Sequence, residues 1–302
     1  MELGDAAAVV EQPRNRGHQV GGIQLTTQTH TLLQTVGGFS FRLEHSPGLE
    51  GRASEIGEIL AAGLTVLSNT LGFSPSLRVL ILSRQDWPRF TKNPVYGMPH
   101  CTDGQTLVMA ADPPEFWEGA RSWVLKPVDS SEMRRLEGLY GTVDGELDVR
   151  PFNDLTALHE LGHIFHRQVP FDFPQPWLRE LFANLCQYVA VAVGLPERMP
   201  YLLALPQAVH RPAEDLIYQS LEDLDRPVAS LGLGNFIWYH WNLLLAARAI
   251  FEREGPGVLR RIFDASLVCC DRPVADDDLI GWLEKKAGPA TAGVMRSWPN
   301  VA

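Results

Sequence analysis

Residues 159–163 have the sequence His159-Glu160-Leu161-Gly162-His163, inside a periodic apolar stretch, 154–167. On an α-helix, two histidines four residues apart lie on one face, a turn from each other. Two neutral imidazoles placed in this way can bind one zinc ion at about 2.0–2.1 Å. Glu160 lies about 100° round the helix from His159, so it can face a water molecule at the metal without binding the metal. The stretch predicts a zinc site with Glu160 as general base.

The residues around the motif favour a helix over 154–167. Asn153 and Asp154 are residue types that commonly cap helix N-termini. The apolar residues recur at helical spacing and predict buried faces: Leu155, Leu158, Leu161, Ile164 and Phe165.

A catalytic zinc usually has three protein ligands and one open position. His166 shares the face of His159, but it lies a further turn along the axis, so it would need a long reach. We therefore expect His166 to be a neighbour of the ligands. Glu180 is the better third ligand, because sixteen residues separate it from His163 and the intervening prolines allow a second helix to return antiparallel. These prolines are Pro170, Pro174 and Pro176.

Asn184 follows Glu180 by one helical turn on the same side. Its amide oxygen could accept a hydrogen bond from the free ring N–H of a ligand histidine. We therefore predict that His159, His163 and Glu180 bind the metal. Asn184 and His166 are predicted to lie next to these ligands and not to bind the metal themselves.

The two segments together resemble the gluzincin metallopeptidases, especially the aminopeptidase N-type catalytic domain and the small peptidase MA-like group. That family has a Trp-Leu-Asn-Glu-Gly-Phe-Ala segment that carries the third zinc ligand. Residues 177–183 of this chain are Trp-Leu-Arg-Glu-Leu-Phe-Ala, with Arg179 and Leu181 at the variant positions and a slightly shorter spacing from the histidines. The resemblance implies a thermolysin-like zincin fold over about residues 38–286.

The resemblance also implies an oxyanion-stabilising tyrosine near the start of a downstream helix. Tyr239 occupies the comparable place, with His240 as the second candidate, since either can donate a hydrogen bond. The Gly-Ala-Met-Glu-Asn segment of the large aminopeptidases is missing. Residues 96–100, Tyr-Gly-Met-Pro-His, stand at a comparable position and contain no acidic residue. Aminopeptidase specificity therefore does not follow.

The order of the predicted elements indicates an α+β fold, with a small mixed β-sheet subdomain followed by a helical subdomain. We expect a flexible arm at 1–35, an α/β subdomain at 36–170 that ends in the motif helix, and a helical subdomain at 171–302. The predicted strands are 39–43, 77–82 and 105–110, and an Asp-Gly hairpin turn is predicted within 143–147. The other predicted helices are 53–71, 177–193, 236–254, 258–265 and 276–286.

Composition excludes several classes. The 302 residues carry a formal net charge of -10, and the sequence pI is about 5.4, which argues against nucleic acid as a partner. No run of 18 apolar residues and no signal-peptide pattern is present, so we expect a cytoplasmic protein with no membrane partner. The four cysteines include no Cys-x-x-Cys pair, so they predict neither a disulfide framework nor a thiolate zinc site.

The predicted function is therefore zinc-dependent hydrolysis of a peptide or small amide, with Glu160 taking a proton from the attacking water. Three alternatives stay open. The chain could be a zinc hydrolase or tailoring enzyme for a non-peptide amide or ester, a catalytically idle binding module, or a zinc-free structural protein.

Overall fold

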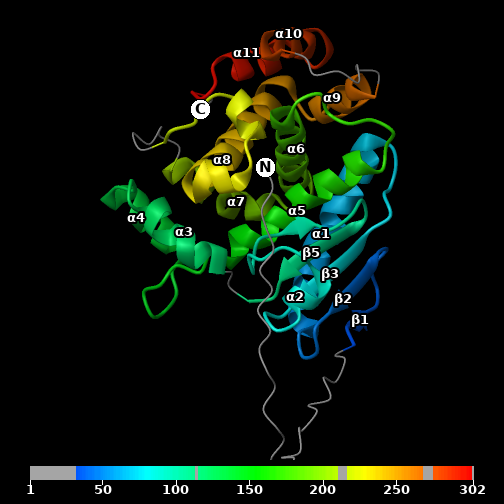
Figure 1. The fold of residues 1–302 in the computed structure, drawn as a ribbon, viewed down its shortest axis with the longest axis vertical. Coiled ribbons are helices and arrows are strands. Elements are labelled where there is room, and N and C mark those ends of the chain that lie inside the picture. Colours follow the sequence, from blue (N-terminus) through cyan, green and yellow to red (C-terminus); the bar gives the residue numbers. More distant parts are fainter. Residues whose placement is uncertain (1–31, 113–114, 210–215, 268–274, 301–302) are drawn as a thin grey trace, which may run out of the picture. The chain divides into compact units, whose positions relative to one another are not determined.

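The computed structural model describes residues 32–112, 115–209, 216–267 and 275–300 (Figure 1). The strands are β1 (Gln34–Val36), β2 (Arg42–His45), β3 (Arg78–Leu82), β4 (His100–Cys101) and β5 (Thr106–Ala110). The helices up to the motif are α1 (Glu50–Leu71), α2 (Trp87–Phe90), α3 (Glu115–Leu125), α4 (Ser130–Tyr140) and α5 (Arg150–Arg167). The helices that follow are α6 (Pro176–Gly194), η1 (Pro196–Arg198), α7 (Met199–Ala208), η2 (Glu222–Asp225), α8 (Val228–Glu254), α9 (Val258–Ser266), α10 (Asp276–Lys286) and α11 (Pro289–Arg296).

The five strands form one mixed sheet in the order β1-β2-β3-β5-β4. The central pairs β2–β3 and β3–β5 are parallel, whereas β1 and β4 are antiparallel edge strands. Parallel neighbours need a crossover connection, and α1 provides the one between β2 and β3. This arrangement places β4 at the sheet edge, where α5 packs beside it.

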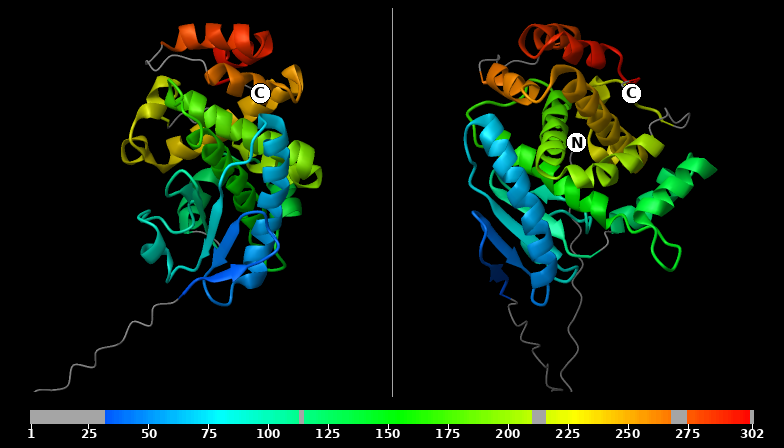
Figure 2. Two further views of the ribbon diagram at one scale, coloured as in Figure 1. Left: turned by 90° about the vertical axis from the view of Figure 1, so that its right-hand side faces the viewer. Right: turned by 180° about the vertical axis from the view of Figure 1, so that it is seen from behind.

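Both faces of the sheet are buried, because alternate residues of β3 and β5 enter two different cores. Val79 and Ile81 of β3 belong to the large core that includes residues of α1 and α5. Leu80 and Leu82 belong to a smaller cluster on the other face, with Trp87 of α2. Seen from behind, α1 lies across the sheet (Figure 2). The helix α5 contacts α1 as well as β4 and β5, so it is fixed against the sheet.

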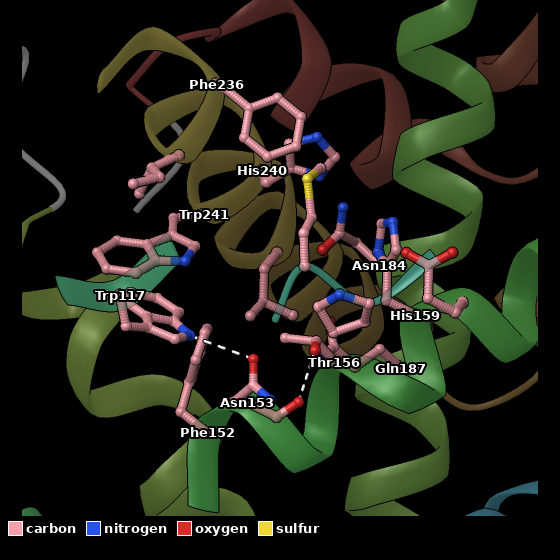
Figure 3. A pocket seen from close by; sticks show the side chains of 15 residues that line it. Trp117, Phe152, Asn153, Thr156, His159, Asn184, Gln187, Phe236, His240 and Trp241 are labelled. Atoms are coloured by element: carbon pink, nitrogen blue, oxygen red, sulfur yellow. Dashed lines mark hydrogen bonds between the residues drawn. The ribbon is translucent and has the colours of Figure 1, made fainter. Parts of the chain in front are cut away.

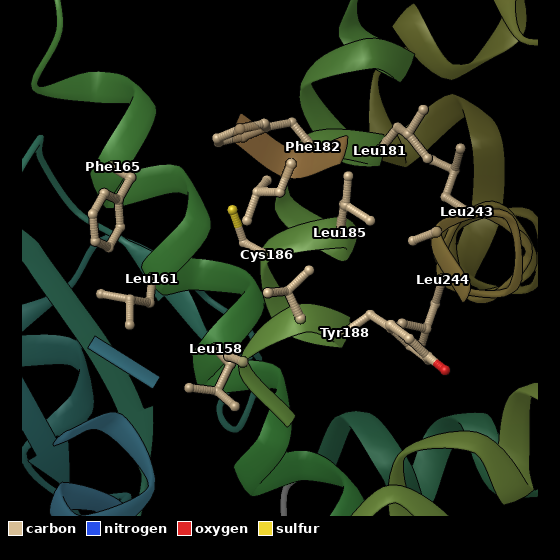
Figure 4. Packing of buried hydrophobic residues seen from close by; sticks show 14 of the residues in the cluster. Leu158, Leu161, Phe165, Leu181, Phe182, Leu185, Cys186, Tyr188, Leu243 and Leu244 are labelled. Carbon is tan, nitrogen blue, oxygen red and sulfur yellow. The ribbon is translucent and has the colours of Figure 1, made fainter. Parts of the chain in front are cut away.

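The helices after α5 build the rest of the large core around α6. This helix packs against α1, α5, α8 and α9, and its residues 181–186 are all fully buried. Figure 4 shows side chains of α5, α6 and α8 in this cluster. One small sheet followed by helices agrees with the expected α+β class.

Most predicted elements are present with shifted ends. The strands 77–82 and 105–110 are confirmed as β3 and β5, and the strand predicted at 39–43 is displaced to β2, Arg42–His45. Phe39 stacks on Phe41 at 5.3 Å instead of extending the strand. The predicted helices after 170 appear as α6, α8, α9 and α10, although α8 begins earlier and contains a non-helical residue, Gly232.

The N-cap predicted at Asn153 and Asp154 is wrong, because α5 begins at Arg150 and both residues lie inside the helix. The Asp154 carboxylate forms an ion pair with Arg52 of α1. The Asn153 side chain accepts a hydrogen bond from the Trp117 indole at 3.2 Å. Both side chains therefore join α5 to its neighbours, and at its N-terminus the Asp148 carboxylate accepts from the Arg150 backbone N–H at 3.0 Å.

The charged stretch from 112 to 150 contains two helices that the sequence analysis did not predict, α3 and α4. Asp129 caps α4 by accepting from the backbone N–H groups of Ser131 and Glu132. The predicted Asp-Gly turn is confirmed, since Thr142 N–H donates to the Glu146 carbonyl at 2.8 Å and Gly145 has φ 76°.

The expected arm, 1–35, falls mostly outside the described residues. At its end, Gln34–Val36 forms β1 and pairs with β2, so this part is a strand. The expected boundary near residue 170 stays a prediction, and α5 and α6 pack across it. Among the described residues no single helix has the length and hydropathy of a membrane span, and 176–194 with 196–208 meet that test only jointly, across a bend of 117°.

Candidate metal centre

The helix α5 presents His159 and His163 on one face, a turn apart. Its apolar residues enter the large core, so its rotation about its own axis is fixed. Both histidines are buried, with 7% of each residue exposed. Their rings meet edge to face, with centroids 4.8 Å apart. The surrounding packing therefore fixes the positions of both imidazole rings.

The helix α6 brings Glu180 to these histidines. Pro176 occupies its first turn, where a missing N–H does no harm. The indole N–H of the buried Trp177 donates to Asp276 at 2.8 Å, which anchors the start of α6. The carboxylate of Glu180, in the next turn, then faces both imidazoles.

A close approach of α5 and α6 makes this meeting possible. It occurs at Gly162, inside the motif, where an added Cβ would lie 2.9 Å from the Ala183 Cα and 3.0 Å from the Cys186 Cβ. The first of these atoms belongs to the backbone, so it cannot rotate away. A side chain at this position would push α6, and with it Glu180, away from the histidines.

We predict that Gly162→Ala lowers the free energy of unfolding by about 1–3 kcal/mol through overpacking, despite the better helix propensity of alanine. Gly138→Ala in α4 is the matched control, because its Cβ meets nothing within 4 Å. The control should be neutral or stabilise by up to about 1 kcal/mol. Urea unfolding of the three proteins measures both effects. A Gly162→Ala protein as stable as the control would contradict the close approach.

The three predicted ligands converge on one point. The His159 and His163 Nε2 atoms are 3.1 Å apart, and they lie 3.2 and 3.3 Å from the Glu180 Oε2 atom. Zinc with bonds of about 2.0–2.1 Å to tetrahedral ligands holds those ligand atoms about 3.3–3.4 Å apart. The observed triangle therefore has nearly the size that one zinc ion needs.

Hydrogen bonds alone explain this triangle poorly. Each Nε2 atom carries at most one proton, and the carboxylate oxygen carries none when it is ionised. If both histidines donate to Glu180, their two Nε2 atoms still face each other as donors at 3.1 Å. Protons thus satisfy two of the three contacts at most, whereas a cation between the three atoms would satisfy all of them.

The electrostatics keep Glu180 anionic. Burial opposes its ionisation, but His163 and His159 outweigh burial and hold the pKa of the carboxyl well below its ordinary value. Burial likewise opposes a charge on His159, yet Glu180 raises the pKa of that imidazole above its ordinary value. A buried carboxylate beside two imidazoles is a donor set that suits zinc.

Each of the two histidine donors has a further polar side chain beside it. His166 lies against His163, with Nε2 to Nδ1 at 3.0 Å, and burial with the neighbouring His163 lowers the pKa of His166 to about 3. A neutral His166 can therefore accept the ring proton of His163. The Asn184 side chain donates to the Glu180 backbone carbonyl at 2.9 Å, and its interaction with the His159 ring contributes to the raised pKa of that imidazole. Both residues thus lie where the sequence analysis placed them.

Glu160 lies beside the two histidine donors. Its carboxylate and the ring nitrogens of His159 and His163 lie within 4.8 Å of one another. The thiol of Cys101, on edge strand β4, donates to the Glu160 Oε2 atom at 3.4 Å. Glu160 therefore faces the space between α5 and the sheet edge. No sequence motif links Cys101 of β4 to the helix that carries Glu160, so this contact was not predicted.

The helix α8 contributes His240 and not Tyr239. The His240 Nδ1 atom is 4.0 Å from Glu180 Oε2, and burial, with His159 and His163, lowers the pKa of His240 to about 4. Tyr239 donates its hydroxyl to the Ser220 carbonyl at 2.7 Å and stacks on Trp298. The Tyr239 hydroxyl is therefore engaged with the Ser220 carbonyl, and its side chain diverges from that of His240 by about 100° round the helix. The structure therefore brings His240, the second candidate, closer to the centre than Tyr239, and the choice of oxyanion donor stays a prediction.

A cavity of about 100 Å³ adjoins the centre. His159, Glu160 and His240 line one end of it. Figure 3 shows the opposite part, where Trp117 of α3, Phe152 of α5 and Trp241 of α8 lie together. Trp117 comes from the charged stretch for which no helix was predicted, and the helical pattern of α3 was the one signal that could have indicated it.

Comparisons with known proteins do not assign this arrangement. A scan against protein-family models found no match, and searches of curated proteins and of solved structures found none either.

Proposed function

We propose that the chain is a zinc-dependent peptidase that hydrolyses peptide bonds. The observation that carries the proposal is the triangle of His159 Nε2, His163 Nε2 and Glu180 Oε2, with sides of 3.1, 3.2 and 3.3 Å. Glu160, beside the two histidines, supplies the general base that a zinc hydrolase needs as well as the metal. The mixed sheet, the motif helix α5 and the returning helix α6 support a gluzincin-type, thermolysin-like zincin fold as part of the same proposal.

The donor set fits zinc, as argued from its distances and its charge. His159, His163 and Glu180 would hold the ion, and His166 and Asn184 would fix the orientation of the two imidazoles. Zinc in such a site polarises a carbonyl group and lowers the pKa of water towards about 7.

Glu160 and His240 supply the remaining chemistry. Glu160 takes a proton from the attacking water and delivers it to the departing amine. His240 is neutral at pH 7, because its pKa is lowered to about 4, so one of its ring nitrogens carries a proton that it can donate. A donated hydrogen bond from this position stabilises the negative charge that develops on the carbonyl oxygen.

A substrate screen tests the proposal. The zinc-loaded protein is incubated with a mixed peptide library and, separately, with a panel of non-peptide amides and esters, and products are identified by mass spectrometry. Peptide fragments that disappear with Glu160→Gln support a peptidase. Turnover of only the non-peptide panel would replace it with the tailoring-enzyme alternative.

The roles of His240 and Tyr239 can be separated with two variants. We expect His240→Phe to retain zinc and to lose roughly 10²–10³-fold in kcat, as for removal of one oxyanion donor. Tyr239→Phe loses its bond to the Ser220 carbonyl, so it should lose about 0.5–1.5 kcal/mol of stability and keep its activity. Steady-state kinetics with a peptide substrate decide between them. The opposite ranking would restore Tyr239 as the donor.

A further inference from the structure

The cavity beside the metal centre lies where part of a bound substrate would be expected. It shares His159, Glu160 and His240 with the centre and extends away from them between α5, α6 and α8. A carbonyl group held at the centre therefore has part of its own molecule directed into this space. What the cavity accepts depends on its walls.

Four aromatic side chains form part of the wall and pack against their neighbours. Trp117 stacks on Trp241 at 5.9 Å, and Phe152 meets both rings edge-on at 5.6 and 5.7 Å. These three rings belong to the second apolar cluster and are almost fully buried. Phe236 lies over the His240 ring, with centroids 4.3 Å apart. Rings fixed in this way give the cavity a defined shape.

Three polar side chains in the walls each make a hydrogen bond within the protein. The side-chain oxygen of Asn153, Oδ1, accepts a hydrogen bond from the Trp117 indole N–H at 3.2 Å. The Thr156 hydroxyl donates to the Asn153 backbone carbonyl at 2.6 Å, and Gln187 donates to the Leu155 carbonyl at 2.9 Å. Among the described lining residues there is no lysine, arginine or aspartate, and the single carboxylate, Glu160, stands at the metal end. A charged group in this cavity would lose its water without gaining an oppositely charged partner away from the metal end.

We propose that this cavity binds a neutral aliphatic side chain, of about leucine or methionine size, on a substrate residue next to the cleaved bond. The inference rests on the proposed function and adds a substrate class to it. An apolar cavity of about 150 Å³ holds a benzene molecule, so one of about 100 Å³ suits a smaller aliphatic group and excludes an indole. Each methylene transferred from water into such surroundings strengthens binding roughly fourfold.

Binding of hydroxamates tests the proposal without turnover, because the hydroxamate group binds zinc and the side chain varies. Calorimetry on the zinc-loaded full chain compares Nα-acetyl hydroxamates of glycine, leucine, norleucine, lysine and tryptophan. We expect the leucine and norleucine compounds to bind roughly 10–100-fold more tightly than the glycine compound. The lysine and tryptophan compounds should gain less than about threefold over glycine. Norleucine and lysine have side chains of equal carbon number, so their difference isolates the charge.

A cavity-filling variant locates the effect. Thr156→Leu places two more carbon atoms in the cavity wall and should reduce the leucine preference over glycine to less than about threefold. Thr65→Leu on α1 is the matched control, because Thr65 is exposed and its hydroxyl also bonds a backbone carbonyl, that of Ala61. If the variant fails to fold, the ligand series on the wild-type protein still decides.

The outcomes separate this inference from the proposed function. Equal affinities across the series, or tightest binding of the lysine or tryptophan compound, would overturn the side-chain cavity while leaving the metal centre intact. Failure of the glycine compound to bind the zinc-loaded chain would overturn the metal centre and the cavity proposal with it.

Discussion

Glu160→Gln should abolish peptide hydrolysis while zinc binding stays unchanged. The substitution keeps the size of the side chain and its ability to accept from the Cys101 thiol, but a neutral amide cannot take a proton from water. A general acid–base group contributes roughly 10²–10⁴-fold to the rate. We therefore expect kcat to fall by at least about 10²-fold. Initial rates on the peptide found in the library screen, together with zinc content by elemental analysis, measure both properties.

Glu58→Gln on α1 is the control for this prediction, because Glu58 is exposed and belongs to another helix. It makes the same chemical change and should leave kcat within about twofold. Hydrolysis retained in Glu160→Gln would remove the general-base assignment. A variant that loses zinc as well as activity would instead give Glu160 a role in holding the metal.

Glu180→Ala should lose zinc affinity as well as activity. The substitution removes one corner of the triangle and leaves two histidines as protein donors. Changes to groups that merely orient zinc ligands weaken binding roughly 10–100-fold, so loss of a ligand itself should exceed about 100-fold. Competition with a chelator of known zinc affinity measures the change directly.

Thermal unfolding gives a second readout of the same substitution. A metal that binds the folded state at a concentration 1,000 times its Kd adds about 4 kcal/mol of stability. At the same zinc concentration a site weakened about 100-fold gains about 1.4 kcal/mol or less, so zinc should raise the Tm of Glu180→Ala by about a third of the wild-type rise or less. The control, Glu284→Ala, loses an exposed ion pair with Arg296 and should keep the zinc-induced rise. An unchanged zinc affinity in Glu180→Ala would move the third ligand elsewhere.

Local spacing predicted the centre of this site because two helices carry it. A four-residue separation fixes His159 and His163 on one face, and the prolines before Trp177 predict a second helix that returns with Glu180. The structure places these three residues at 3.1–3.3 Å from one another. His166 and Asn184 follow by the same reasoning, since each lies about one turn from a ligand on the same helix.

The parts that local spacing left open depend on contacts between distant segments. Tyr239 and His240 are neighbours in sequence, and only the packing of α8, with Trp298 against Tyr239, decides which one faces the centre. Trp117 and Cys101 reach the site from α3 and β4. No local pattern in one sequence specifies where such segments lie. Asp129, by contrast, was a visible capping signal for α4, obscured by the high charge around it.

The central claim is that His159, His163 and Glu180 hold one zinc ion, and anomalous scattering at the zinc absorption edge tests it most directly. Crystals of the zinc-loaded protein should give one strong peak about 2.0–2.2 Å from the two Nε2 atoms and a Glu180 carboxylate oxygen. A peak bound by His166 or Cys101 in place of Glu180, or no peak at the two histidines, would contradict the account.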